Sequence, residues 1–229
     1  MRATRPFFAR SPVVMAKALL GQRLVRILDD GTRLAGTIVE TEAYCGVEDA
    51  AAHAYRGRRT PRNEAMYSAP GTAYVYFTYG MHFCMNVVCG RENQPVAVLL
   101  RALEPTEGLD RMREHRLASR RAGRTAPAAD SPGAAAQEPA VPTLRDRELC
   151  SGPARLCQAL AIDRRHNLID LTSDDRLWIE VLRSTPAAPP ARRVGNTARI
   201  GVGYAGEWAV KPLRWFLTSS DHVSRPSRS

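Results

Sequence analysis

Residues 23–44 read RLVRILDDGTRLAGTIVETEAY, and this stretch decides the fold. Two runs rich in apolar and β-branched residues, 23–28 and 33–44, flank the turn sequence DDGT at 29–32. An Asp-Gly turn between two such runs is typical of a β-hairpin. The stretch therefore predicts two antiparallel strands that can start a sheet.

Further strands and helices are predicted on both sides of this hairpin. Ser11 and Pro12 carry the signals of a helix start, and Gly21 carries those of its end. Runs rich in Val, Tyr, Phe or Trp predict strands at 72–77, 82–89, 96–102, around Trp178, at 199–202 and at 213–217. Helices are predicted at 104–121 and 149–161. Because the helices cluster and do not alternate with the strands, we expect an α+β fold: a curved, largely antiparallel sheet, open and barrel-like, with surrounding helices.

The whole chain, 1–229, is predicted to be a single domain that contains one insertion. Residues 122–142 include four prolines, many alanines and no aromatic residue. Such a segment cannot bury enough apolar surface to offset the entropy lost on ordering, so it is predicted to be disordered. A second Pro-rich loop is expected at 184–193.

The composition excludes several classes of protein. Hydrophobic residues make up 44% of the chain and charged residues 24%, as in a globular protein. No apolar stretch approaches the roughly 20 residues of a membrane span, and the N-terminus lacks the apolar core of a secretory signal. The five cysteines form no C-x-x-C pair and, with five scattered histidines, resemble no zinc site. We expect a soluble, intracellular protein without a metal or cofactor.

The charge of the chain favours a nucleic-acid partner. Its 33 Lys and Arg residues against 23 acidic residues give a net charge of +10. Many of the arginines fall in two segments, 56–62 and 111–124. A solvated basic face without a partner is the alternative. Frequent Arg and Ala with few lysines indicate a GC-rich genome, so we expect a cytoplasmic protein, or a nuclear one if the source is eukaryotic.

Two carboxylates share a strand face at the end of the hairpin. Period-two alternation in GTIVETEAY, residues 36–44, puts Ile38, Glu40, Glu42 and Tyr44 on one side. A buried carboxylate is costly unless it is paired or used, and like charges in one site raise the pKa of at least one of them. A solvent-facing strand, or a salt bridge to one of the arginines, is the alternative interpretation.

An aromatic cluster lies in TAYVYFTYGMHFCMN, residues 72–86. Three of the seven tyrosines of the chain fall within six positions of this segment. Aromatic side chains beside basic loops can stack on extruded bases, and each stack is worth roughly 1–3 kcal/mol. A plain aromatic core strand is the alternative, but three hydroxyl groups followed by Gly80 fit a half-exposed surface better.

Seven ordered blocks now give the chain a specific resemblance. They are ETEAY (40–44), His53, RTPRN (59–63), PGTAYVYFTYGMHFCMN (70–86), LLRALEP (99–105), LCSGPARLCQALAI (149–162) and RIGVGYAGEWAVKPLRW (199–215). Together they resemble the alkyladenine, or 3-methyladenine, DNA glycosylase family over nearly the whole chain outside 122–142. Members of that family flip a damaged purine out of duplex DNA before they excise it.

The resemblance implies roles for five residues around the flipped base. Glu42 matches the carboxylate that activates water for attack on the anomeric carbon. Tyr44 and Tyr76 match the side chains that sandwich the base, with His53 beside them. Asn86 matches a residue that excludes normal guanine by meeting its exocyclic amino group.

The resemblance also implies contacts with DNA outside the base pocket. The residues expected at intercalation or backbone contacts are Tyr79, Met81, His82 and Arg101. Tyr79 matches the wedge that fills the vacated stack, and Arg101 matches a residue close to the backbone. His82 departs from the family pattern, which has tyrosine there, and this departure concerns a DNA contact rather than the chemistry.

The implied activity is monofunctional excision in base excision repair. Cleavage of an N-glycosidic bond builds oxocarbenium-like charge on the sugar, which a carboxylate can stabilise while it takes a proton from water. The chain has only two lysines and none in the carboxylate or aromatic block, so no Schiff-base lyase step is expected. The implied partner is double-stranded DNA that contains alkylated or deaminated purines, the product is an abasic site, and we expect a monomer.

Three other interpretations compete with this one. The glycines of 201–206 fit G-x-G-x-x-G, but only 23 residues follow and Pro212 interrupts any helix, so a dinucleotide site is not expected. A non-catalytic nucleic-acid-binding module would explain the charge and the tyrosines but leave Glu42 without a role. A carbohydrate hydrolase using Glu40 and Glu42 fits a charge of +10 poorly.

Overall fold

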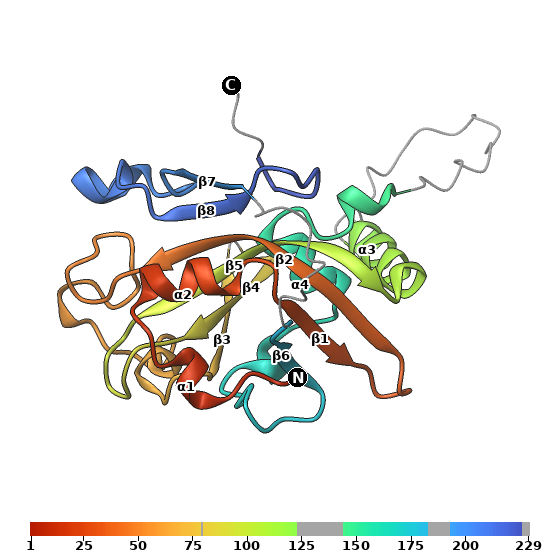
Figure 1. Cartoon of the computed structure of the whole chain (residues 1–229), viewed down its shortest axis with the longest axis horizontal. Helices are drawn as coiled ribbons and strands as arrows, with labels where there is room; N and C mark the ends of the chain where they lie inside the picture. Colours follow the sequence, from red (N-terminus) through yellow and green to blue (C-terminus); the bar gives the residue numbers. More distant parts are fainter. Residues whose placement is uncertain (79, 123–143, 183–192, 226–229) are drawn as a thin grey trace, which may run out of the picture.

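In the computed structural model, the segment 23–44 forms the predicted hairpin, and the second strand of this hairpin is central in the sheet (Figure 1). Strand β1 (Arg23–Ile27) pairs antiparallel with the first part of β2 (Arg33–Tyr44). The structure describes residues 1–78, 80–122, 144–182 and 193–225. The insertion predicted at 122–142 and the loop predicted at 184–193 lie outside these residues, apart from residues 122 and 193.

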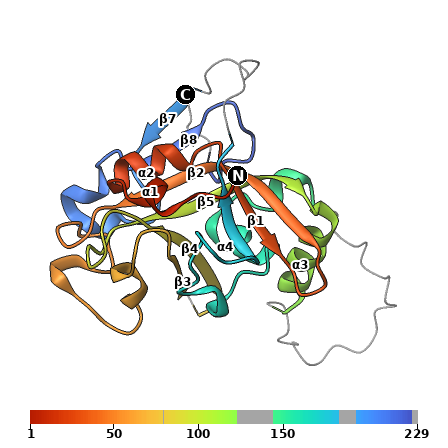
Figure 2. The ribbon, with the colours of Figure 1, turned by 60° about the horizontal axis from the view of Figure 1, so that its bottom comes forward.

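In the described part of the chain, eight strands form one antiparallel sheet that does not close. The six strands outside the hairpin are β3 (Ala73–Thr78), β4 (His82–Val88), β5 (Ala97–Glu107), β6 (Leu177–Glu180), β7 (Val194–Thr197) and β8 (Arg214–Leu217). The order of the strands in the sheet is β3-β4-β5-β2-β1-β6, while β8 pairs with β2 and β7 pairs with β8. Figure 2 shows the helices arranged around this sheet. The predicted α+β class with an open antiparallel sheet is confirmed.

Strand β2 changes its partner halfway along its length. One edge follows β5, whereas the other pairs with β1 up to Thr37 and with β8 from Glu40 to Glu42. Where the partner changes, the β2–β5 register shifts, which marks a β-bulge. Ile38 therefore packs in the main core, and Val39 joins a separate small cluster. The prediction that Ile38 shares the face of Glu40 and Glu42 is wrong, because the bulge interrupts the alternation.

Strand β5 extends further than predicted and shortens the helix that follows it. Helix α3 spans Leu109–Ala122, so its start predicted at residue 104 is wrong. Pro105 pairs with Gly36 of β2 on a stretch of β5 that β4 no longer flanks. A proline costs no ladder hydrogen bond at such an unpaired edge. Gly108, with φ of 74°, then turns the chain from strand to helix.

Helix α4 (Pro153–Ala159) is shorter than the helix predicted at 149–161. Ser151 still forms a β-bridge with Ala102 of β5. Gly152 has φ of 134°, which is outside the helical range, so the helix begins only at the following proline. The sequence pattern located this helix correctly but not its ends.

The strand predicted at 199–202 is also wrong. Besides β2, the partner of β8 is β7, which begins five positions before the predicted strand, and 199–202 forms a loop. A Cβ at Gly195 would lie 2.4 Å from the Phe216 ring, so close pairing of these two strands requires glycine there. The 199–202 loop leaves the sheet because its polar groups bond to buried carboxylates, as described below.

The remaining elements are short. Helices α1 (Arg5–Phe8) and α2 (Pro12–Leu19) lie near the N-terminus, and 3₁₀ turns occur at Tyr55–Gly57, Glu64–Tyr67, Asp146–Glu148, Arg164–His166 and Gly203–Ala209. Apolar side chains of α2, α3 and α4 share the main core with the sheet. The Thr41 hydroxyl donates to the Ala16 carbonyl, 2.9 Å away, so α2 covers the face of β2 opposite Glu40 and Glu42. Within the described ranges, no helix combines the length and apolarity needed to cross a membrane.

Candidate active site

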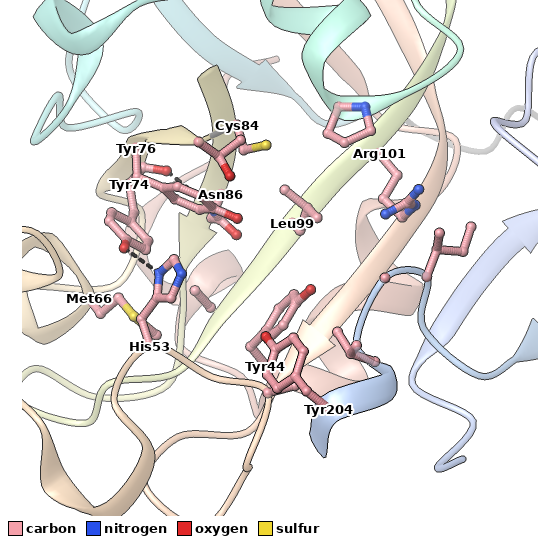
Figure 3. Close-up of a pocket in the computed structure, with 17 residues that line it drawn as sticks. Tyr44, His53, Met66, Tyr74, Tyr76, Cys84, Asn86, Leu99, Arg101 and Tyr204 are labelled. Atoms are coloured by element: carbon pink, nitrogen blue, oxygen red, sulfur yellow. Dashed lines mark hydrogen bonds between the residues drawn. The ribbon is translucent and has the colours of Figure 1, made fainter. Parts of the chain in front are cut away.

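A cavity of about 190 Å³ lies at the C-terminal end of β2 (Figure 3). Residues of β2, β3, β4 and β5 line part of it, and residues of loops, of two 3₁₀ turns and of the start of α4 line the rest. Five residues singled out from the sequence meet in its wall: Tyr44, His53, Tyr76, Asn86 and Arg101. Other residues in the wall include Met66, Tyr74, Cys84, Leu99, Ile200 and Tyr204. The fold thus brings together side chains that are dispersed along the sequence.

One side of the cavity is built from His53 and two tyrosines. The His53 ring stands edge-on to Tyr76, with ring centroids 4.6 Å apart. Its Nδ1 shares a hydrogen bond of 2.7 Å with the Tyr74 hydroxyl (Figure 3). Burial, helped by the Arg62 and Arg58 cations, lowers the pKa of His53 to about 4. The imidazole is therefore neutral at pH 7, and this wall carries no charge of its own.

Tyr44 lies across the cavity from Tyr74 and Tyr76 (Figure 3). Its hydroxyl donates to Oε2 of Glu42 over 3.1 Å, and burial raises its pKa, so it remains a neutral donor. The Arg199 guanidinium carbon lies 4.7 Å from the centroid of its ring. Aromatic walls on two sides suit a flat, aromatic ligand.

Glu42 is fully buried behind the wall of the cavity. Its Oε1 lies 3.2 Å from Nη1 of Arg101 and accepts the Ile200 N–H over 2.8 Å, while Oε2 accepts from Tyr44. These three partners all line the cavity. Burial raises the pKa of Glu42 and outweighs the Arg101 cation and the hydrogen bonds. This carboxylate therefore holds a proton more readily than an ordinary glutamate.

Glu40 is equally buried but much better paired. Its Oε1 accepts from Nε of Arg101 at 3.0 Å, from Nε of Arg214 at 2.6 Å and from the Ser224 hydroxyl at 2.9 Å. Its Oε2 accepts the Ser224 N–H at 2.6 Å. Burial alone would raise the pKa of Glu40, but the Arg101 and Arg214 cations lower it below the ordinary value. Glu40 is thus a stable anion.

Arg101 lies inside the site rather than on an outer surface. Only 6% of the residue is exposed, and its guanidinium contacts Glu40, Glu42 and the Ser224 hydroxyl. The contact with the DNA backbone predicted for this residue remains a prediction. The observed contacts place Arg101 between the two carboxylates, a position that period-two alternation did not indicate.

The other predicted DNA contacts lie at or near the hairpin between β3 and β4. Met81 is 68% exposed at its tip, whereas His82 is half-buried and its Nδ1 lies 3.5 Å from the Gln158 side-chain nitrogen. Tyr79, the predicted wedge, is outside the described residues. Asn86 is buried on β4, where its side-chain N–H donates to the Tyr74 carbonyl over 3.1 Å.

Sequence reasoning missed Asp49 and Arg199 as members of the site. They form an ion pair with both side chains fully buried. Because they are 150 positions apart, no local pattern connects them. The contact of Tyr74 with His53 was also missed, although alternation along β3 places Tyr74 on the same side as Tyr76.

The glycine-rich segment 201–206 serves the cavity as a loop. Gly201 is in the cavity wall with φ of 80°, and Gly206 has φ of 56°. A 3₁₀ turn, not an α-helix, begins at Gly203. The interpretation of these glycines as a turn rather than a dinucleotide fingerprint is supported.

Over the part of the chain that the structure describes, no group of three or more His, Cys, Asp or Glu side chains is placed to hold a metal ion. The expectation that the protein needs no metal or cofactor remains a prediction.

Comparison with known proteins gives this site a family. The model of the methylpurine-DNA glycosylase family matches residues 6–221. The DNA-3-methyladenine glycosylase of Homo sapiens is 49% identical over 218 residues, 95% of this chain and 66% of that protein. A putative 3-methyladenine DNA glycosylase of Clostridium acetobutylicum is 39% identical over 224 residues, 98% of each chain. One of Anaeromyxobacter dehalogenans is 43% identical over 227 residues, 99% of this chain and 87% of that protein.

The lengths covered differ between these relatives. The chain spans 60 to 66% of the mammalian relatives and nearly all of the clostridial one. The match of the family model and the identity over almost the entire chain lead to one conclusion. The chain belongs to the methylpurine-DNA glycosylase family.

Proposed function

We propose that this protein is a DNA glycosylase that flips alkylated or deaminated purines out of duplex DNA and hydrolyses their N-glycosidic bond. One observation carries the proposal: Glu42 is a buried carboxylate of raised pKa whose three partners all line an aromatic cavity. The names of the relatives, DNA-3-methyladenine glycosylase among them, support the same activity.

The damaged base would bind between the aromatic walls. Tyr44 on one side and Tyr76 with His53 on the other offer stacking surfaces, each worth roughly 1–3 kcal/mol. Asn86 lies in the same wall and would meet the edge of the purine. Because the pKa of His53 is lowered to about 4, the pocket would not repel a cationic alkylated purine through this side chain at pH 7.

Glu42 would carry the chemistry. Departure of the purine builds positive charge on the sugar, and an ionised carboxylate stabilises it and takes a proton from the attacking water. A raised pKa makes Glu42 a stronger base once it is ionised. Arg101, 3.2 Å from its Oε1, would favour the ionised form and orient it.

The absence of a suitable amine supports a monofunctional enzyme that leaves an abasic site. A lyase step requires a nucleophilic amine at the sugar. The two lysines contact tryptophan rings, Lys17 at Trp215 and Lys211 at Trp208, and neither is among the residues of the cavity wall.

The partner we propose is double-stranded DNA that contains damaged purines, bound by a monomer. The net charge of +10 suits a polyanion, and the exposed Met81 lies on a hairpin whose strands β3 and β4 contribute to the cavity wall. Tyr79, Met81 and His82 are the residues we propose for intercalation and contact with the DNA. We further propose a cytoplasmic location, or a nuclear one in a eukaryote.

The test is an excision assay on duplexes that each contain one hypoxanthine, one ethenoadenine or one alkylated purine. The wild-type protein should release the base, so that hot alkali then cleaves the strand at the lesion. Glu42→Gln should lose nearly all of this activity, while Glu114→Gln, at a largely exposed glutamate, should behave as wild type. Lesion binding without cleavage by the wild type on any duplex would favour a non-catalytic binding module. Cleavage without alkali would contradict a monofunctional enzyme.

A further inference from the structure

The Asp49–Arg199 ion pair is the most completely buried pair of charges in the described part of the molecule, with both side chains 0% exposed. Nη1 and Nη2 of Arg199 donate to the two carboxylate oxygens of Asp49 over 2.6 and 2.8 Å. Asp49 also accepts the backbone N–H groups of Cys45 and Ala51, at 2.9 and 3.0 Å. The pair therefore joins the segment after β2 to the loop at 199–202.

The same guanidinium reaches the strand that carries the catalytic carboxylate. Nη1 of Arg199 donates to the carbonyl of Ala43 over 2.9 Å, between Glu42 and Tyr44 in the chain. The guanidinium carbon of Arg199 lies 4.7 Å from the centroid of the Tyr44 ring. The residue that follows, Ile200, donates its backbone N–H to Oε1 of Glu42 over 2.8 Å. The ion pair thus holds the backbone at Ala43, next to Glu42, and the backbone at Arg199, next to the Ile200 N–H that Glu42 accepts.

Folding alone does not account for two charges at this depth. Removing a carboxylate and a guanidinium from water is costly, and apolar side chains of similar volume often stabilise a fold as well or better. What an apolar pair cannot do is bind the two Asp49 oxygens and the carbonyls of Ala43 and Trp208 in fixed directions, as the planar guanidinium does. The fork of Arg199 sets the orientation of the 199–202 loop and of the N–H that points at Glu42.

We propose that the Asp49–Arg199 ion pair is a positioning device for the catalytic carboxylate, and that it acts by fixing the backbone N–H of the next residue. This inference rests on the proposed function, because it requires Glu42 to be the catalytic group. Arg199 is a positioning residue in this scheme, since its contacts lead to Glu42 through the Ile200 backbone and the Tyr44 ring.

Several other charged or titratable groups interact electrostatically with Glu42. They are Glu40 and Tyr44 on β2, Tyr76 on β3, Cys84 on β4, Arg101 on β5 and Arg199 on the loop. The Ile200 N–H stabilises the ionised form of Glu42. Losing that donor should raise the pKa of Glu42 further, so the acid limb of the rate profile should move to higher pH.

The experiment uses the full-length chain with Asp49→Leu and Arg199→Met combined, so that neither charge is left buried alone. Single-turnover excision is measured with enzyme in excess over a lesion duplex. We expect the rate constant to fall about 100-fold while the amplitude stays full, because misplacing a catalytic group by a small distance has that effect. The acid limb of the profile should shift upward. The matched control is Asp29→Asn with Arg176→Gln, which removes an exposed ion pair and should leave the rate constant unchanged.

A second variant keeps the test valid if the double variant does not fold. Arg199→Lys retains the charge beside Asp49 but cannot form the planar fork, so its rate constant should also fall, with full amplitude. A loss of amplitude at the wild-type rate constant would mean that the pair only supports folding, and would overturn the inference. So would a wild-type rate constant and acid limb in every Arg199 variant. Glu42→Gln, run in parallel, separates the two ideas: excision by that variant at the wild-type rate would overturn the proposed function itself.

Discussion

Glu40 and Glu42 are two residues apart on one strand, and both are 0% exposed, yet their surroundings differ sharply. Glu40 meets two arginines and the backbone N–H and hydroxyl of Ser224, and its pKa is lowered. Glu42 meets one arginine, one hydroxyl and one backbone N–H, and its pKa is raised. A pair of titratable groups whose pKa values are pushed apart is a common basis for dividing an anionic role from a proton-transfer role.

The difference arises from the strands that flank each residue. β8 supplies Arg214 to Glu40, and the segment that follows β8 supplies Ser224. Glu42 is contacted instead by the loop at 199–202. This loop offers it a backbone N–H and not a cation. The fold thus gives one carboxylate full compensation for its burial and the other only part of it.

The largest effect should appear in the excision rate when each of the two carboxylates is replaced in turn by an amide. Glu42→Gln should lower the single-turnover excision rate by about 10²–10⁴-fold, because a general base and its charge are lost. Glu40→Gln should retain most of the rate per folded molecule. The rates are measured on one lesion duplex with enzyme in excess. Equal losses in the two variants would show that the two carboxylates act as one unit.

The next largest effect should appear in the free energy of unfolding, where Glu40→Gln, not Glu42→Gln, should be the more damaging substitution. Glu40→Gln leaves the guanidinium groups of Arg101 and Arg214 buried without their anion, which should lower the free energy of unfolding by about 3–5 kcal/mol. Urea unfolding followed by circular dichroism measures this change. Glu107→Gln, at a partly exposed carboxylate that pairs with Arg23 and Arg33, is the control and should cost less than about 1 kcal/mol. If Glu40→Gln lowered the free energy of unfolding by less than about 1 kcal/mol, Glu40 would not be the anion that compensates the buried arginines.

The two carboxylates should also give stability opposite slopes against pH. The lowered pKa of folded Glu40 means that its contribution is present above the ordinary value of 4.5 and is lost as pH falls through the folded pKa. The raised pKa of folded Glu42 means that the folded state binds more protons, so stability is lost as pH rises from 4.5 through the folded pKa.

Unfolding free energies of Glu42→Gln and the wild type, measured across this pH range, test the second slope. The variant should be at least as stable as the wild type at pH 7, and its advantage should vanish below about pH 4.5, where the wild-type carboxyl is protonated as well. A variant that is less stable than the wild type at pH 7 would show that the ionised Glu42 is fully compensated, as Glu40 is.

The smallest effect is expected across the cavity, away from both carboxylates. Tyr74→Phe removes the hydroxyl that bonds to Nδ1 of His53 and should lower the free energy of unfolding by about 0.5–1.5 kcal/mol. Excision should keep the wild-type acid limb, because Tyr74 does not contact Glu42. A shift of the acid limb in Tyr74→Phe would show that the His53–Tyr74 side of the cavity also affects the pKa of Glu42.

The sequence predicted much of the framework from local patterns. The hairpin at 23–44 and the strands β3 and β4 were found to within one or two residues, because alternation and turn residues act over short distances. The limits of β5 and α3 were missed because Pro105 is tolerated only where one strand edge is unpaired. That condition depends on the length of β4 and not on the proline.

The site divides in the same way. The spacing of Glu42 and Tyr44 and the tyrosines of β3 are properties of the sequence, and the resemblance of the blocks carried them to a family. The bulge at Val39, the burial of Arg101 between two carboxylates and the Asp49–Arg199 pair were decided only by the tertiary structure. Register and long-range pairing depend on which surfaces meet after the chain has folded, and partners 150 positions apart leave no periodic signal.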